Sequence, residues 1–382
     1  MIIAVDEDLP YREEAFGGLG EICLFPGRAL RPEAIRYADA LIVRSVTRVD
    51  ASLLERSSVR FVAGASAGTD NIDRKYLDDR GIRFSYAAGC NADAVAEYVI
   101  TALHIAASRR RWDLAAKSLA VVGVGNVGSR VAKKAGALGM KVFLCDPPLH
   151  DLTGDARYLP FEDILGADIL TFHVPLVMEG PYPTWHLMDD GRLKLLSPDQ
   201  YLINSARGPV FSNQDLKSAL QKKRIEGAVL DVWEVEPRVD YSLLDLVDIG
   251  TPHIAGTALD GKIRATEMVR NEFCAFFGIQ SAWDTAPLYP AERTVRPAEK
   301  TSSQDAILSV LLQASNIMDY DAGLRELKSA PAEQAAARFD RMRSEVRPRP
   351  EFRHFFVDLS GGNADLAGKF TAMGFKADAE RP

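Results

Sequence analysis

Short apolar runs separated by polar or helical stretches recur along much of this chain. Near the N-terminus, MIIAV and ALIVRS have the length and composition of strands buried in a parallel sheet. A long, largely apolar helix follows from Asp93, and it leads into a second series of strands that starts with LAVVGVG and ends with VDIGTPHI. Strands that alternate with helices predict an α/β fold built on doubly wound parallel sheets.

The same pattern divides the chain into three predicted domains. Residues 1–95 form a first α/β unit, and a segment at about 258–285 returns to it. Residues 96–257 form a second unit around the second series of strands. Residues 286–382 begin with a proline-containing stretch and continue as helices with a strand, which predicts a small α/β domain. This last domain either mediates oligomerisation or adds packing, and the residues leave both open.

Composition and charge exclude several classes of protein. Hydrophobic residues make up 47% and charged residues 26%, and the first residues carry acids rather than a basic leader, so we expect no membrane span and no signal peptide. Net charge is −7, and no basic run is longer than the one at 109–111, which argues against a nucleic-acid partner. The cysteines form no CxxC pair, so we expect no metal site, no disulfides and a cytoplasmic location; they are Cys23, Cys90, Cys145 and Cys274.

The sequence GVGNVG predicts a dinucleotide site. Gly123, Gly125 and Gly128 form a G-x-G-x-x-G pattern between the strand LAVV and a helix that starts near Asn126. The glycines permit a tight turn, close approach of the backbone to a pyrophosphate and close packing of helix on strand. Asp146 ends the next strand, where an acid accepts hydrogen bonds from the ribose and repels a 2′-phosphate. These features predict a Rossmann-type domain that binds NAD rather than NADP.

Three residues at strand ends downstream of this loop predict oxidation of an alcohol next to a carboxylate. His253, in TPHIAG, follows a strand, and Glu236, in DVWEVEP, ends the loop after another. A carboxylate hydrogen-bonded to His253 fixes the tautomer and stabilises the protonated ring, so the pair can accept and return a proton. Arg207, in INSARG, follows a third strand and can hold a substrate carboxylate bidentately while polarising the C2 oxygen.

The other histidines have simpler interpretations. His104 lies in an apolar helix, His150 and His186 lie in loops, and His354 lies outside the predicted sheet domains. His173 ends a strand, where it either lines the cofactor cleft or packs in the core.

The order GVGNVG, CDPP, INSARG, DVWEVEP and TPHIAG resembles the D-2-hydroxyacid dehydrogenases. The resemblance is specific up to about residue 285 and looser beyond it. It implies that the first unit is a flavodoxin-like lid domain that binds substrate, and that residues 286–382 form a dimerisation domain of a homodimer. It also implies catalysis by the arginine, glutamate and histidine at Arg207, Glu236 and His253, with NAD as cofactor.

The resemblance also assigns binding residues, with Asp231 on the nicotinamide carboxamide and Val174 acting through its backbone. The implied cofactor contacts are Gly123, Gly125, Asn126, Val127, Gly128, Asp146, Val174, Ser205, Ala206, Arg207, Asp231 and Gly256.

Motifs in the first unit and the WHL segment resemble family members that act on a phosphorylated four-carbon hydroxy acid. On that basis Ser45, Ser66 and Thr257 are expected to bind substrate, and Arg44 is our choice for part of the phosphate site. Those members carry threonine at Ser66 and tyrosine at Thr257, so the change at Thr257 puts substrate affinity in question. Two other functions stay open: a family dehydrogenase with another substrate, such as 3-phosphoglycerate or an unphosphorylated acid, and a non-enzymatic NAD(H) sensor.

Overall fold

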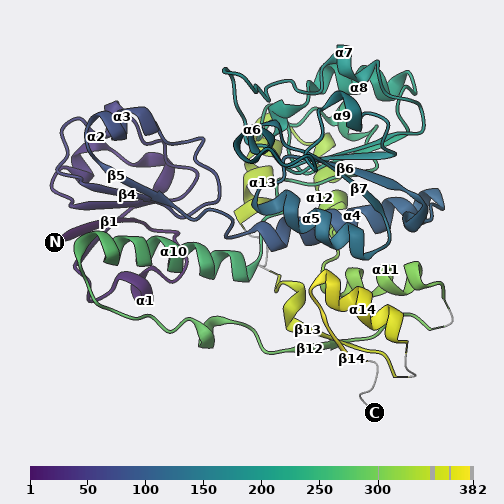
Figure 1. Cartoon of the computed structure of the whole chain (residues 1–382). Coiled ribbons are helices and arrows are strands. Elements are labelled where there is room, and N and C mark those ends of the chain that lie inside the picture. Colours follow the sequence, from purple (N-terminus) through teal and green to yellow (C-terminus); the bar gives the residue numbers. More distant parts are fainter. Residues whose placement is uncertain (300, 345–348, 361–362, 379–382) are drawn as a thin grey trace. The chain divides into compact units, whose positions relative to one another are not determined.

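The computed structural model describes residues 1–299, 301–344, 349–360 and 363–378 of the chain (Figure 1). The chain divides into two compact units, one of Met1–Asn91 with Ala258–Pro290 and one of Ala92–Thr257 with Ala291–Pro382. The C-terminal segment, expected to be a domain of its own, is thus grouped with the second unit. No helix in the described ranges is long and apolar enough to cross a membrane.

The first unit is a five-stranded parallel sheet with helices on its faces. Its strand order is β2-β1-β3-β4-β5, which is the flavodoxin-like order. Apolar residues fill every position of β3 and all but the last, a glycine, of β4, as expected for central parallel strands. The strands are β1 (Ile2–Asp6), β2 (Glu21–Phe25), β3 (Ala40–Val43), β4 (Phe61–Gly64) and β5 (Arg83–Tyr86), and the helices are α1 (Arg12–Phe16), α2 (Ala51–Leu54), α3 (Arg74–Asp79) and α10 (Leu259–Phe277).

Helix α10 completes the core of this unit although it follows the second sheet in sequence. Phe273 is fully buried, and its ring meets Phe16 and Phe61 edge-on at centroid distances of 5.6 and 5.9 Å. Buried Arg270 donates from Nε to the carbonyl of Ala15 at 2.9 Å. The segment that returns after residue 257 is therefore an integral part of the first unit.

The second unit contains a six-stranded parallel sheet with the order β11-β10-β9-β8-β6-β7. An isolated parallel bridge between Leu144 and Tyr158 stands where the third strand of a Rossmann sheet would pair. In this strand order the chain proceeds in opposite directions from β6, so the switch point lies between β6 and β8. Doubly wound folds bind their ligands at such a point. The strands are β6 (Ser118–Val122), β7 (Lys141–Cys145), β8 (Ile169–Phe172), β9 (Tyr201–Asn204), β10 (Gly227–Leu230) and β11 (Ile249–Gly250).

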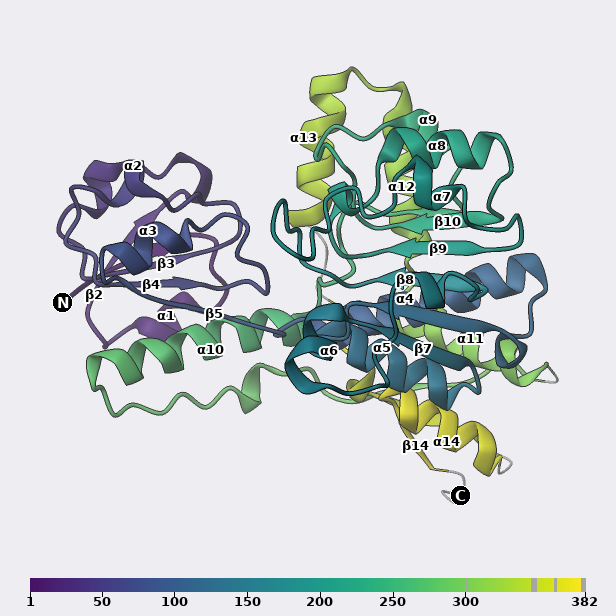
Figure 2. The ribbon, with the colours of Figure 1, turned by 45° about the horizontal axis from the view of Figure 1, so that its top comes forward.

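Helices cover both faces of this sheet, and each face has its own apolar core (Figure 2). On one face lie α4 (Ala92–Arg110) and α5 (Asn126–Ala137). Leu193, Leu216 and Leu243 pack in the other core; they come from α7 (Asp190–Leu193), α8 (Asn213–Gln221) and α9 (Tyr241–Leu244). Between β7 and the next strand runs α6 (Pro147–Thr153).

The C-terminal segment adds to both of these cores. Its helices α11 and α14 pack with α4 and α5, whereas α12 and α13 contribute Leu324 and Phe339 to the other core. Buried Glu97 of α4 accepts a hydrogen bond from the backbone N–H of Phe352 at 2.8 Å, and burial raises the pKa of this carboxyl to about 7. The elements are β12 (Arg293–Val295), β13 (Phe355–Asp358) and β14 (Lys376–Asp378), which form a parallel sheet, and α11 (Ser303–Ala314), α12 (Met318–Glu326), α13 (Ala332–Ser344) and α14 (Ala364–Met373).

The packing of α10 predicts a large stability loss for Phe273→Ala. Removing a fully buried phenyl ring leaves a cavity and should cost about 3–5 kcal/mol of unfolding free energy. Urea unfolding followed by circular dichroism measures this loss. Phe276→Ala on the same helix is the matched control, because Phe276 is 42% exposed, and its loss should be much smaller. Equal losses for both variants would contradict the assignment of α10 to this core.

Candidate active site

The glycine loop between β6 and α5 has the shape that a pyrophosphate needs. Gly123 has φ +85°, and a Cβ there would lie 2.8 Å from the carbonyl of His173. At Gly128 a Cβ would lie 1.9 Å from the carbonyl oxygen of Gly123, so the helix packs directly on the turn. Gly125 has no atom within 4 Å of a Cβ position and caps α5 without a side chain. The first N–H groups of α5 are therefore open to an anion.

Asp146 ties this loop to the end of the next strand. Its Oδ2 accepts a hydrogen bond from the N–H of Val124 at 2.7 Å, and its Oδ1 caps α6 through the N–H of Leu149 at 3.0 Å. The carboxylate is half-buried and retains lone pairs beyond these bonds. It stands beside the glycine loop, and its contact with the cofactor ribose stays a prediction.

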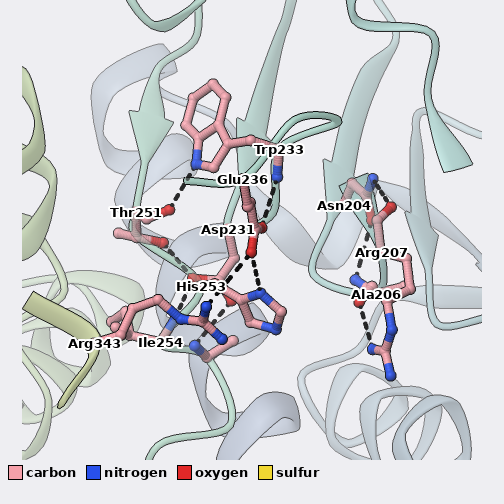
Figure 3. Close-up of polar contacts among 11 residues, drawn as sticks. Asn204, Ala206, Arg207, Asp231, Trp233, Glu236, Thr251, His253, Ile254 and Arg343 are labelled. Carbon is pink, nitrogen blue, oxygen red and sulfur yellow. Dashed lines mark hydrogen bonds and ion pairs between the residues drawn. The ribbon is translucent and has the colours of Figure 1, made fainter. Parts of the chain in front are cut away.

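His253 and Glu236 form a hydrogen-bonded pair at the carboxyl edge of the sheet (Figure 3). The Nδ1 of His253 lies 2.8 Å from Oε2 of Glu236, and Oε1 of Glu236 accepts the N–H of Trp233 at 3.0 Å. Burial opposes ionisation of Glu236, yet the hydrogen bond and charge of His253 and the N–H of Trp233 hold the pKa of this carboxyl below its ordinary value. Because Nδ1 faces Glu236, the other ring nitrogen of His253, Nε2, is the one left for a substrate.

A buried carboxylate, Asp231, holds the turn that carries His253. Its Oδ1 accepts the hydroxyl of Thr251 at 2.7 Å and the N–H of Ile254 at 2.8 Å, and its Oδ2 accepts the N–H of Ala255 at 2.9 Å. His253 has a left-handed φ of 56°, a conformation that is uncommon for residues other than glycine. Asp231 is 1% exposed, and its Oδ2 can still accept a further hydrogen bond. Its contact with the nicotinamide carboxamide stays a prediction.

Arg207 lies in the loop after β9, the strand next to β10. The side chain of Asn204 shapes this loop: its Nδ2 donates to the carbonyl of Arg207 at 2.9 Å, and its Oδ1 accepts the N–H of Ala206 at 3.0 Å. Nη1 of Arg207 donates to the carbonyl of Ala206 at 2.8 Å. Arg207, Glu236 and His253 all follow strands at the same edge of one sheet, as Figure 3 shows.

The remaining predicted cofactor residues lie along the same edge. The Oγ of Ser205 is buried and has no hydrogen-bond partner within the described ranges, which suits a group that meets a ligand. Val174 packs against the core beside Gly123, and Gly256 is half-buried in the turn after His253. Asn126 and Val127 begin α5. Together with the open helix end, the orphaned hydroxyl fits a dinucleotide.

The predicted substrate residues of the first unit also follow parallel strands. Ser45 follows β3, and Ser66, after β4, donates from Oγ to the carbonyl of Gly68 at 3.0 Å. Arg44 is paired with two acids, with Nε 3.0 Å from Oδ1 of Asp6 and Nη2 2.5 Å from Oδ2 of Asp8. Part of the positive charge of Arg44 is therefore already balanced.

Thr257, in the second unit, lines a cavity of about 170 Å³. Tyr98, Asn316, Tyr320 and Arg349 are among the other residues around this cavity. The C-terminal segment thus forms part of the surroundings of the turn that follows His253.

The structure shows the surroundings of three other histidines. His173 is half-buried, and burial of its ring lowers the pKa of its imidazole to about 3, which makes it a poor proton acceptor near neutral pH. Burial also lowers the pKa of His104, to about 4. Nε2 of His186 lies 2.6 Å from Oε1 of Glu234, a contact that its place in a loop did not predict. The pairing joins the loop after β8 to the loop that carries Glu236.

Sequence reasoning missed Arg343 of α13. Its Nη1 lies 3.8 Å from Oε2 of Glu236. The residue is distant in sequence from every motif of the site, so no spacing pattern could have pointed to it.

Comparisons with known proteins agree with this geometry. The family model for the NAD binding domain of D-isomer specific 2-hydroxyacid dehydrogenases matches residues 97–255. A protein of Salmonella arizonae named erythronate-4-phosphate dehydrogenase is 40% identical over 99% of this chain and 98% of its own length. A protein of Cronobacter sakazakii with the same name is 42% identical over 99% and 98%. The chain belongs to the D-isomer specific 2-hydroxyacid dehydrogenase family.

A solved structure supports the fold and cofactor of this D-2-hydroxyacid dehydrogenase. The D-lactate dehydrogenase of Aquifex aeolicus, solved with NAD and lactic acid, matches 72% of this chain and 95% of its own, with a TM-score of 0.61 and 25% identity. The predictions of a parallel α/β fold, of a dehydrogenase of this family and of NAD as cofactor are confirmed.

The glycine loop predicts a selective effect of Gly128→Ala on cofactor binding. The new methyl group would collide with the carbonyl of Gly123, so the loop must open and NADH affinity should fall by about tenfold or more. Titration by NADH fluorescence measures the affinity. Gly136→Ala is the matched control on the same helix, since a Cβ there has no atom within 4 Å. An unchanged affinity in Gly128→Ala would show that NAD does not use this turn.

Proposed function

We propose that this dehydrogenase oxidises 4-phospho-D-erythronate to (R)-3-hydroxy-2-oxo-4-phosphooxybutanoate, a step of pyridoxal 5′-phosphate biosynthesis. The observation that carries the chemistry is the 2.8 Å hydrogen bond between His253 and Glu236 beside a dinucleotide loop. The substrate comes from the full-length relatives, whose printed name specifies erythronate 4-phosphate. Bound NAD supplies the hydride acceptor, and the protein supplies the groups that position and polarise the acid.

His253 takes the proton of the C2 hydroxyl in this proposal. The ring receives it at Nε2, because Nδ1 is held by Oε2 of Glu236. Glu236 is ionised at neutral pH, so it stabilises the imidazolium that forms when the hydroxyl proton arrives. The same pair returns the proton when the reaction runs in reverse.

Arg207 holds the substrate carboxylate and polarises the C2 oxygen. Its planar guanidinium suits bidentate binding of a carboxylate, and the carbonyl of Ala206 already fixes one of its N–H groups at 2.8 Å. A carboxylate held there places C2 and its hydrogen in a constant position relative to His253. Orientation of this kind lowers the entropic part of the barrier.

The cofactor is held, in this proposal, by the residues of the glycine loop and the strand ends. Gly123, Gly125, Asn126, Val127 and Gly128 take the pyrophosphate. Asp146 takes the ribose hydroxyls, and a carboxylate there disfavours the 2′-phosphate of NADP. Further contacts come from Val174, Ser205, Ala206, Arg207, Asp231 and Gly256.

Ser45, Ser66 and Thr257 contact the substrate, with Arg44 on the phosphate ester. Hydroxyl and backbone N–H groups suit phosphate oxygens, and both serines stand at strand ends of the first unit. We also propose that the enzyme is a cytoplasmic homodimer in which residues 286–382 mediate dimerisation. Sedimentation equilibrium of the full chain tests this assembly.

Turnover of four acids tests the proposed substrate. The rate of NADH formation is measured with 4-phospho-D-erythronate, D-erythronate, 3-phospho-D-glycerate and D-lactate. We expect the highest kcat/KM for the first acid, by at least about tenfold, because it alone has the phosphate and the chain length together. A preference for 3-phospho-D-glycerate would keep the enzyme class and replace the substrate. NADH binding without turnover of any acid would favour the sensor function.

His253→Asn should abolish most of the activity while leaving NAD in place. Loss of a general base typically costs about 10²–10⁴-fold in rate, and asparagine keeps a polar side chain of similar reach toward Glu236. The measurements are kcat for NADH formation and the dissociation constant of NADH. His150→Asn is the control, since His150 is an exposed residue of α6. A kcat for His253→Asn within about twofold of wild type would remove His253 from the mechanism.

A further inference from the structure

Helix α13 of the C-terminal segment brings a positive charge to the proposed catalytic pair. Nη1 of Arg343 lies 3.8 Å from Oε2 of Glu236, the oxygen that also meets His253. Figure 3 shows the guanidinium of Arg343 directed toward this pair from an element outside the sheet. The motifs that define the dehydrogenase domain lie far from residue 343 in sequence.

The position of Arg343 is set by buried packing of its helix. Phe339, one turn earlier on α13, is fully buried in the core that also contains Leu243 of α9. The guanidinium carbon of Arg343 lies 6.0 Å from the centre of the Phe339 ring, a cation–π distance. The side chain of Arg343 is 30% exposed, so it is partly shielded from water as it approaches Glu236. The packing of α13 in the core therefore sets the position of Arg343.

The positive charge of Arg343 favours the ionised form of Glu236. Oε1 of this carboxylate is occupied by the N–H of Trp233, and Oε2 is occupied by His253. Burial opposes its ionisation, while the hydrogen bond and charge of His253, the N–H of Trp233 and the charge of Arg343 favour it. The guanidinium stays charged at every working pH. Arg343 thus supports the ionised form of Glu236 even when His253 is neutral and contributes no charge.

Asp231, in the loop after β10, is a further charged neighbour of the pair. It interacts electrostatically with His253, and burial raises the pKa of this carboxyl. Arg343 of α13 brings the opposite charge to Glu236.

We propose that Arg343 is a positioning residue that keeps Glu236 ionised and directed at His253, and so makes the C-terminal segment part of the catalytic apparatus. The inference rests on the proposed roles of Glu236 and His253. It gives α13 a function beyond assembly. Without Arg343, the pair retains its proton to higher pH, and a smaller fraction of the enzyme has the neutral base that oxidation requires.

The test compares Arg343→Gln, Arg343→Lys and the control Arg338→Gln in the full-length enzyme. Arg338 lies on the same helix and is exposed. The pH profiles of kcat and kcat/KM are measured for oxidation of 4-phospho-D-erythronate. For Arg343→Gln we expect the acid limb to move up by about half a pH unit and kcat at neutral pH to fall by up to about threefold, the factor that such a shift gives. In Arg343→Lys, kcat and the position of the acid limb should both lie close to the wild-type values, because lysine keeps the positive charge. Arg338→Gln should match wild type.

Thermal unfolding and NADH affinity complete the comparison. Both should stay near wild type in Arg343→Gln, because Phe339 still anchors the helix. An unchanged pH profile with a lower melting temperature would mean that Arg343 only supports the fold, and would overturn the proposal. A raised KM for the phosphorylated acid alone, with an unchanged profile, would also overturn it and make Arg343 a phosphate ligand.

Glu236→Gln separates this inference from the proposed function. If Glu236→Gln is inactive and Arg343→Gln behaves as wild type, only the role of Arg343 fails. If Glu236→Gln itself retains full activity, the proposed mechanism fails with it.

Discussion

The buried carboxylate of Asp231 is the interaction on which the site depends. It accepts hydrogen bonds from Thr251, Ile254 and Ala255, and so closes the turn after β11 onto the end of β10. Three such bonds compensate for the cost of burying the group, and they fix a left-handed backbone at His253. A turn held in this way directs the histidine ring at Glu236 before any substrate arrives. The preorganised pair then needs little rearrangement during the reaction.

The C-terminal segment is joined to the same part of the sheet. Asp321 of α12 accepts the N–H of Gly250 on the edge strand β11 at 2.7 Å, and its neighbour Arg325 donates to the carbonyls of Leu244 and Val247. These contacts cover the sheet edge beside the turn of His253. The segment that covers this edge also carries Arg343, which approaches Glu236 of the proposed catalytic pair.

Much of the fold and the principal chemistry could be predicted from local patterns. Apolar runs of strand length identified parallel sheets, and GVGNVG identified the start of the dinucleotide domain, because these features are written in short stretches of sequence. Arg207, Glu236 and His253 could be predicted to lie near one another because each follows a strand, and parallel strands bring their ends together; their catalytic roles stay a prediction. The role of Asp231 as the anchor of a turn, the pairing of Glu234 with His186 and the approach of Arg343 depend on contacts between distant segments. No periodicity encodes such contacts, and the cores that the described C-terminal helices share with α4 and α9 could not be predicted for the same reason.

The central claim is that the pair of His253 and Glu236 removes the hydroxyl proton while the hydrogen on C2 passes directly to NAD. Incubation of the enzyme with NAD and 4-phospho-D-erythronate deuterated at C2, followed by mass spectrometry of the cofactor, tests it most directly. Each NADH formed should carry one deuterium, and the reaction should be slower than with the unlabelled acid. NADH without deuterium, or deuterium released to the solvent, would contradict it.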